Sequence, residues 1–167
     1  MENDADYWIQ LLNMKPHPEG GYFAETYRSK NILGKHCLPE TISGERNIAT
    51  SIFFLLKESD FSAFHRLQSD ENWYFHDGSG IVIYRIDAEG ELIKQKLGLD
   101  LRNDFLPHVT VPRGSWFAAE PVGKGFALVS CVVSPGFDPK DFELAKSAKL
   151  ATAFPQHKEL IERLCIS

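Results

Sequence analysis

The sequence predicts an all-β fold, a barrel or sandwich of short strands with one short peripheral helix near each end of the chain. Two observations lead to this class. Nine apolar segments are separated at short intervals by turn residues, as in antiparallel sandwiches and barrels. The chain is also rich in aromatic residues, with 12 Phe and 3 Trp, which favour β structure. Its 167 residues suit a single domain over 1–167.

The two ends are expected to be helical. Trp8, Leu11 and Leu12 recur at helical spacing over 5–13, behind Asn3 or Asp4 as a cap, and the pattern stops before Pro16. A second short helical pattern covers 156–164. The expected strands between them are 22–28, 48–56, 62–67, 73–75, 81–86, 92–97, 108–111, 115–119 and 126–133.

The connections are also partly readable. Segments 76–80 and 88–91 contain the Gly and Asp residues that tight turns need, and each is expected to join antiparallel neighbours. Segment 29–45 is polar with little periodicity, so a long loop is expected there, and loops of that length often serve function.

Charge and composition exclude several classes of function. The net charge of -5, without a basic cluster, argues against nucleic-acid binding. No apolar run reaches the roughly 18 residues needed to span a bilayer, and the first residues lack a basic leader, so we expect a cytoplasmic protein without a membrane partner. Cys37, Cys131 and Cys165 form no Cys-x-x-Cys pair, and Cys131 is expected to be a small buried residue.

Segments 64–78 and 111–117 carry the most specific pattern in the chain. His65, Glu71, Gly78 and the sequence from Pro112 to Gly114 are similar to the two strand-turn-strand motifs of a cupin barrel, which hold a metal in most members of that superfamily. The pattern departs at Leu67 and Phe117, where the resemblance would place two further histidines.

Two protein ligands are few for a catalytic zinc or iron, which usually has three and an open position. We therefore expect neither a metal nor another cofactor; if a metal bound, His65 and Glu71 would be its ligands. His76 or His108 would have to complete such a site, and His76 has the opposite strand parity to His65.

The resemblance extends over nearly the whole chain and points to one family of uncharacterised cupins. It is carried by His17-Pro18-Glu19-Gly20-Gly21-Tyr22-Phe23, Glu25-Thr26-Tyr27-Arg28, Ser51-Ile52-Phe53-Phe54-Leu55-Leu56, Ser69-Asp70-Glu71-x-Trp73, Pro112-x-Gly114-x-Trp116 and Pro135-Gly136-Phe137. It implies a cupin-type double-stranded β-helix, a jelly-roll barrel like that of the metal-free dTDP-sugar epimerases. It also implies a homodimer and no settled activity.

The candidate site is a pocket inside this barrel. His65 and Glu71 are the candidate catalytic pair, because a carboxylate can orient an imidazole and raise its basicity. The resemblance favours Glu25 and Arg28 at the pocket rim, where an arginine could hold a phosphate or carboxylate. Glu19 is expected to be a surface charge. Three aromatic residues complete the candidate ligand-binding set, although each would serve equally as core: Phe75, Trp116 and Phe117.

The leading hypothesis is a cupin that binds a small molecule, a sugar derivative or other polar metabolite, around His65 and Glu71. The main alternative is a metal-independent sugar isomerase or epimerase with His65 as base, Tyr74 or Tyr84 as acid and Arg28 as oxyanion stabiliser. A metal-dependent oxygenase and a structural or storage protein are further alternatives. The expected partners are the small molecule and a second copy of the chain.

Overall fold

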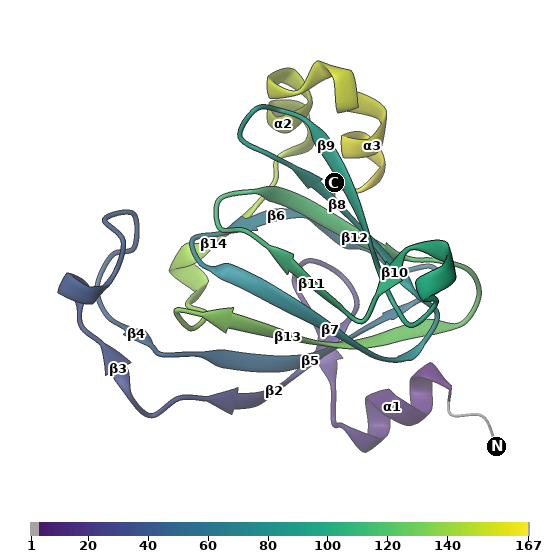
Figure 1. Cartoon of the computed structure of the whole chain (residues 1–167), viewed down its shortest axis with the longest axis horizontal. Coiled ribbons are helices and arrows are strands. Elements are labelled where there is room, and N and C mark those ends of the chain that lie inside the picture. The colour runs from purple at the N-terminus through teal and green to yellow at the C-terminus, as the bar shows by residue number, and fades with distance from the viewer. Residues whose placement is uncertain (1–3, 167) are drawn as a thin grey trace.

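The computed structural model describes residues 4–166, which form two six-stranded sheets packed face to face (Figure 1). In spatial order, the first sheet contains β1 (Lys15–Pro16), β2 (Tyr22–Arg28), β5 (Thr50–Lys57), β13 (Phe126–Ser134), β7 (Asp70–Gly78) and β11 (His108–Val111). The second sheet contains β10 (Phe105–Leu106), β9 (Leu92–Leu97), β8 (Ile81–Ile86), β12 (Trp116–Pro121), β6 (Ser62–Leu67) and β14 (Phe142–Leu144).

The core lies between the two sheets, where strand alternation turns one set of side chains inward. Phe54, Trp73 and Val129 from the first sheet pack there against Ile83 and Phe117 from the second. Burying each such large side chain contributes about 1.5–3 kcal/mol relative to leaving it exposed. The polar side chains described below lie beside this core, because Phe54 and Cys131 belong to the core and also line the pocket.

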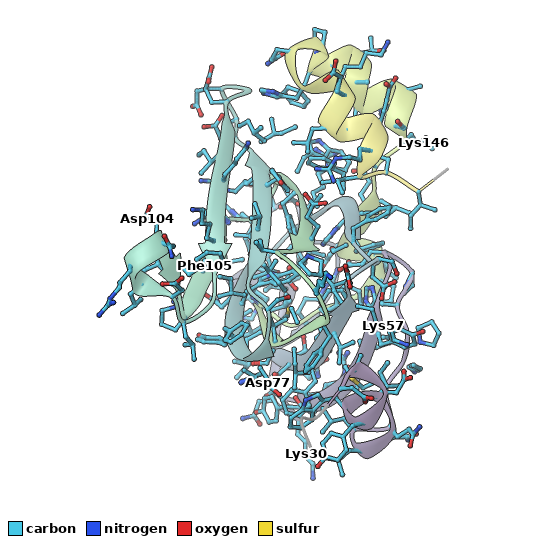
Figure 2. All side chains as sticks on the ribbon, turned by 90° about the vertical axis from the view of Figure 1, so that its right-hand side faces the viewer. Lys30, Lys57, Asp77, Asp104, Phe105 and Lys146 are labelled. Carbon is cyan, nitrogen blue, oxygen red and sulfur yellow. The ribbon has the colours of Figure 1, made fainter. Side chains whose placement is uncertain are left out.

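Helices cover the outer faces of both sheets. Helix α1 (Ala5–Leu11) lies against the first sheet, and α2 (Ser147–Ala153) and α3 (Lys158–Arg163) cover part of the second (Figure 1). Two hydrogen bonds hold α1 in place: Trp8 Nε1 donates to Asp77 Oδ2 at 3.0 Å, and Lys57 Nζ donates to Asp6 Oδ1 at 2.8 Å. Figure 2 shows the positions of Asp77 and Lys57. This second layer explains why β5 and β13 contain runs of consecutive apolar residues rather than simple alternation.

The expected elements agree with the structure in most places. Every expected strand is present, and five have the expected bounds. The N-terminal helix ends at Leu11, and Asp4 caps it by accepting from the Tyr7 amide at 2.8 Å, while Asn3 lies outside the described residues. The C-terminal helical region is larger than expected, because α2 precedes α3. The expected loop 29–45 contains β3 (Ile32–Leu33), which pairs with β4 (Arg46–Asn47) in an arm at the edge of the molecule (Figure 1).

One prediction about the connections is wrong. The turn at 88–91 joins the antiparallel neighbours β8 and β9, as expected. The turn at 76–80, however, passes from β7 in the first sheet to β8 in the second, and these strands do not pair. Gly78 there has φ +87°, and an added Cβ would lie 2.1 Å from the Phe126 carbonyl oxygen. Glycine is therefore needed at position 78 because two backbone segments approach closely there. In a sequence, such a glycine looks the same as one in a hairpin turn.

Candidate functional site

A pocket of about 150 Å³ lies between the two sheets, at the end opposite the turn at Gly78. Its charged and titratable side chains lie at two depths. Arg28 and Glu25 are 39% and 43% exposed at the rim, whereas His65 and Glu71 are 2% and 7% exposed at the floor. The other lining residues are His17, Glu19, Phe23, Thr50, Ile52, Phe54, Leu67, Cys131, Val133, Phe137, Pro139 and Phe142.

His65 is held in one orientation by its own strand. Its Nδ1 lies 2.8 Å from the carbonyl oxygen of Ala63. A carbonyl oxygen only accepts, so Nδ1 carries the proton and Nε2 of the neutral ring is a free acceptor. That Nε2 lies 3.3 Å from Glu19 Oε2. The sequence therefore placed the histidine in the pocket and missed the carboxylate that contacts it.

Glu19 is not the surface charge expected from its position in the sequence. It is 6% exposed, and its Oε1 accepts a hydrogen bond from the Ser62 hydroxyl at 2.8 Å. Burial, the largest effect, raises the pKa of Glu19, and burial likewise lowers the pKa of His65. Both shifts favour the uncharged pair, in which the protonated Glu19 carboxyl group donates a hydrogen bond to His65 Nε2.

His17 completes this cluster and was not predicted as a site residue. Its Nδ1 accepts from the Glu19 backbone amide at 3.3 Å and lies 3.6 Å from Glu19 Oε2. Burial lowers the pKa of His17, although the nearby Glu19 charge opposes this. His17 and Glu19 lie in a turn, closed by the Gly20 amide donating to the His17 carbonyl oxygen at 3.0 Å, so the alternation of a strand gave no signal for them in the sequence.

Glu71 faces the same pocket from β7, on the opposite sheet from His65. Burial, the largest effect, raises the pKa of Glu71 to about 7, and the charges of His65 and Glu19 act in opposite directions on it. Its Oε2 is fully buried and has no partner at hydrogen-bond distance within residues 4–166, although the side chains of Trp73 and Cys131 lie close enough to lower its pKa. Cys131 lies beside it, and burial raises the pKa of this thiol well above its usual range, so it stays protonated.

The two departures from the metal-binding pattern both lie near His65. Phe117 is its cross-strand neighbour in β12, with ring centroids 4.1 Å apart, and Leu67 lines the pocket on the same strand face. Among the described residues, no group of three or more His, Cys, Asp or Glu side chains is placed to hold a metal ion. His76 and His108 lie on the outer face of the first sheet, bonded to Ser130 and Asn72, so neither completes a site with His65.

The predicted rim residues lie at the pocket mouth and bind each other. Arg28 Nε and Nη2 donate to the two carboxylate oxygens of Glu25 at 3.0 and 2.7 Å. Arg28 Nη1 also donates to Asn47 Oδ1 at 2.9 Å and to the Phe137 carbonyl oxygen at 3.1 Å. The guanidinium thus connects β2 to the segment that forms the far wall of the pocket.

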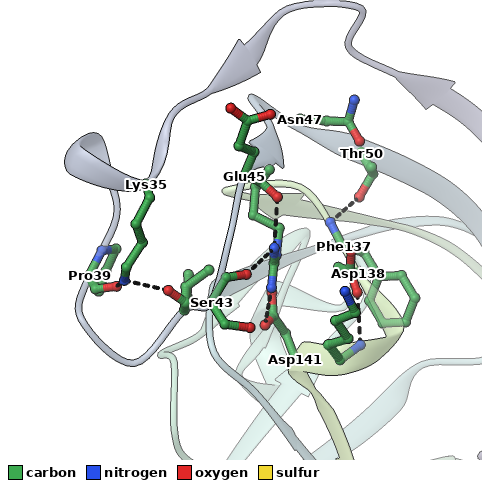
Figure 3. Close-up of polar contacts among 12 residues, drawn as sticks. Lys35, Pro39, Ser43, Glu45, Asn47, Thr50, Phe137, Asp138 and Asp141 are labelled. Atoms are coloured by element: carbon green, nitrogen blue, oxygen red, sulfur yellow. Dashed lines mark hydrogen bonds and ion pairs between the residues drawn. The ribbon is translucent and has the colours of Figure 1, made fainter.

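Further contacts hold that wall segment in place (Figure 3). The Phe137 amide donates to Thr50 Oγ1 at 2.9 Å. The buried Asp141 accepts two hydrogen bonds from Arg46, from Nε at 2.6 Å and from Nη2 at 2.7 Å. The end of the expected loop 29–45 is joined to this Arg46–Asp141 pair, since Arg46 also donates to the Ser43 carbonyl oxygen at 2.7 Å.

Several predicted residues lie outside the pocket. Phe75 packs at the edge of the inter-sheet core, and Trp116 lies under the Arg66 guanidinium at 4.5 Å on the helix-covered side of the second sheet. Phe117 contacts His65 from the core without lining the pocket. Tyr74 stacks on His108 at the outer surface, and Tyr84 donates to Glu120 at 2.8 Å. The structure therefore brings His65, Glu71, Glu25 and Arg28 together in the pocket, with Phe117 packed behind His65 and the other aromatic residues elsewhere.

A family model described as the cupin superfamily (DUF985) matches residues 6–145. The chain belongs to this family. Together with the two-sheet architecture, the match confirms the predicted cupin jelly roll. Within the described residues, no helix has the length and apolar character needed to cross a membrane.

Relatives of this cupin support the same assignment. It is 41% identical to protein SO0799 from Shewanella oneidensis, with a TM-score of 0.87 over 98% of each chain. It is 32% identical to a hypothetical protein from Leishmania major, with a TM-score of 0.89 over 99% of this chain and 100% of that one. The uncharacterised protein YML079W from Saccharomyces cerevisiae is 32% identical over 155 residues, which cover 82% of this chain and 74% of that protein. These names state no ligand or activity.

Proposed function

We propose that this cupin binds a small polar metabolite in the pocket between its sheets, with Glu71 and His65 in contact with it. The observation that carries the proposal is the buried Glu71 Oε2, which faces the pocket and has no hydrogen-bond partner within residues 4–166. A buried polar atom left without a partner costs about 1–3 kcal/mol. A ligand that bonds this oxygen would offset that cost.

The shape of the pocket limits the ligand. Its volume of about 150 Å³ is below the roughly 300–1,000 Å³ typical of sites for drug-sized molecules. A sugar derivative, the ligand expected from the sequence, would fit with little more than its ring inside. The nucleotide of a sugar nucleotide would lie beyond the Arg28–Glu25 rim, where Arg28 is already bonded to Glu25, Asn47 and Phe137.

Binding of a metabolite panel, followed by ¹⁵N NMR, tests this proposal. A ligand of this pocket should shift the amides of lining residues such as Ile52 and Val133. Its affinity should fall about tenfold or more in Glu71→Gln, because hydrogen bonds to charged groups contribute about 1.5–3 kcal/mol. Glu143→Gln, which removes an exposed carboxylate outside the pocket, is the matched control and should bind normally. Unchanged binding in both Glu71→Gln and His65→Ala would show that the site is elsewhere.

A second candidate function is proton transfer, as in an isomerase acting next to a carbonyl group. It is favoured by the pKa of about 7 for Glu71 in the same pocket as His65, because an acid–base catalyst works best when its pKa is near the ambient pH. Tyr74 and Tyr84 lie outside the pocket, so Glu71 and His65 would have to remove the proton from the substrate and return it without a tyrosine. Deuterium incorporation from D₂O into small hydroxy ketones, lost in Glu71→Gln, would support this; no exchange across such a panel would refute it.

A further inference from the structure

The charged groups of the pocket differ from those of an anion site. Arg28 is the one Arg or Lys among its lining residues. Four of the five guanidinium N–H groups already donate to Glu25, Asn47 and Phe137. The remaining basic lining residues are the partly buried His17 and the buried His65, and burial lowers the pKa of both, which favours their neutral forms. An anionic ligand would therefore find no uncommitted cation in the pocket.

The floor of the pocket is rich in acceptors instead. Glu19 already has partners, because it accepts from Ser62 and faces His65 Nε2 at 3.3 Å. Glu71 is different, since its buried Oε2 has no partner in the part of the chain that the structure describes. The Trp73 and Cys131 side chains lie close to this carboxylate, yet within residues 4–166 Oε2 is the one buried side-chain polar atom of the lining residues that has no hydrogen-bond partner. A ligand group that fits it must donate a hydrogen bond, and a positively charged donor would gain most in this buried setting.

The walls select for the rest of the ligand. Phe54, Phe137 and Phe142 line the pocket together with Ile52 and Val133. A sugar ring would leave several hydroxyl groups without partners against such walls, whereas an apolar body would be buried favourably. Aromatic rings also attract cations through their negatively charged faces. A cavity of about 150 Å³ accommodates a molecule about the size of benzene.

Building on the proposed binding function, we propose that the ligand is a small organic cation, a primary ammonium group on a compact apolar body. The ammonium donates to Glu71 Oε2 at the floor, and the body lies against the phenylalanine rings. This assigns the pocket to an amine metabolite rather than to a sugar nucleotide or another anion.

Three probes of similar shape and different charge test the assignment: benzylamine, benzyl alcohol and benzoate, titrated separately at pH 7.5 and followed by ¹⁵N NMR. We expect benzylamine to bind about tenfold or more tighter than benzyl alcohol, equivalent to about 1.4 kcal/mol, and benzoate to bind weakest. In Glu71→Gln, benzylamine and benzyl alcohol should bind with affinities within about twofold of each other. Glu143→Gln should keep the preference for benzylamine, because this carboxylate lies outside the pocket.

Equal or tighter binding of benzyl alcohol or benzoate at the pocket would overturn the assignment and leave the binding function standing. A preference for benzylamine that persists in Glu71→Gln would also overturn it, because the ammonium would then lie elsewhere. The same holds if benzylamine does not bind at millimolar concentration while members of the metabolite panel bind in a Glu71-dependent way. If neither the probes nor the panel bind, both proposals fail. The comparison of the three probes on the parent protein decides the charge preference even if Glu71→Gln does not fold.

Discussion

Removing the Glu71 carboxyl should stabilise the protein, relative to the parent, more at neutral pH than at acidic pH. The pKa of this group is about 7 in the folded protein and about 4.5 when unperturbed. Between these values the folded state keeps a proton that the unfolded chain has lost, so ionisation favours unfolding as the pH rises. At about 1.36 kcal/mol per pH unit, the loss amounts to about 3 kcal/mol between pH 4.5 and pH 7. Below pH 4.5 both states are protonated, and above pH 7 both are ionised.

Glu71→Gln keeps the shape of the side chain and removes this titration. Its free energy of unfolding minus that of the parent should therefore increase by about 3 kcal/mol from pH 4.5 to pH 8. Urea denaturation followed by tryptophan fluorescence measures this difference, since Trp73 is buried beside the site. Glu89→Gln, at an exposed turn, is the control and should differ from the parent by no more than about 0.5 kcal/mol at any pH. A pH-independent difference for Glu71→Gln, or one that falls with pH, would refute the reasoning.

Two further substitutions test what holds the pocket together. Arg46→Met should lower the free energy of unfolding by about 3–5 kcal/mol, because it leaves Asp141 charged and buried; the double variant Arg46→Met/Asp141→Leu should recover most of this loss, and an equally unstable double variant would contradict the argument. Gly20→Ala should cost about 1–2 kcal/mol more than Gly125→Ala in the same urea assay. Both glycines have positive φ, but a Cβ at Gly20 would lie 2.1 Å from the Phe61 carbonyl oxygen and one at Gly125 meets open space, so equal costs would count against this steric account.

The strands could be predicted because their signal is local. Apolar segments bounded by Gly, Asp and Pro located the strands in the sequence, and the bounds of β2, β6 and β8 agree with the structure. The partners of each strand could not be predicted in this way. The turn at Gly78 resembles a hairpin in sequence, yet its two flanking strands belong to different sheets, because turn residues report the backbone conformation and not the partner. Helix α2 was missed because its seven residues show little periodicity.

The candidate site was predicted only in part. His65 and Glu71 lie on consecutive strands of a recognisable motif, and the pocket brings them together from opposite sheets. Glu19 and His17 were not predicted as site residues, because a charged residue before the first long strand is exposed in most proteins. Their burial depends on Ser62 and His65, which lie more than forty residues away in the sequence. Trp116 was predicted as a ligand-binding residue, but it does not line this pocket, and its ring lies under the Arg66 guanidinium.

The sequence by itself determined the family, the jelly-roll class and the two departures at Leu67 and Phe117, since each is a matter of residue type and spacing. The tertiary structure decided the protonation and charge of the pocket. Burial raises the pKa values of Glu19 and Glu71, and contacts with Glu25, Asn47 and Phe137 occupy Arg28. These properties depend on how far each group is removed from water and on which distant segment faces it, and both are set only when the two sheets pack.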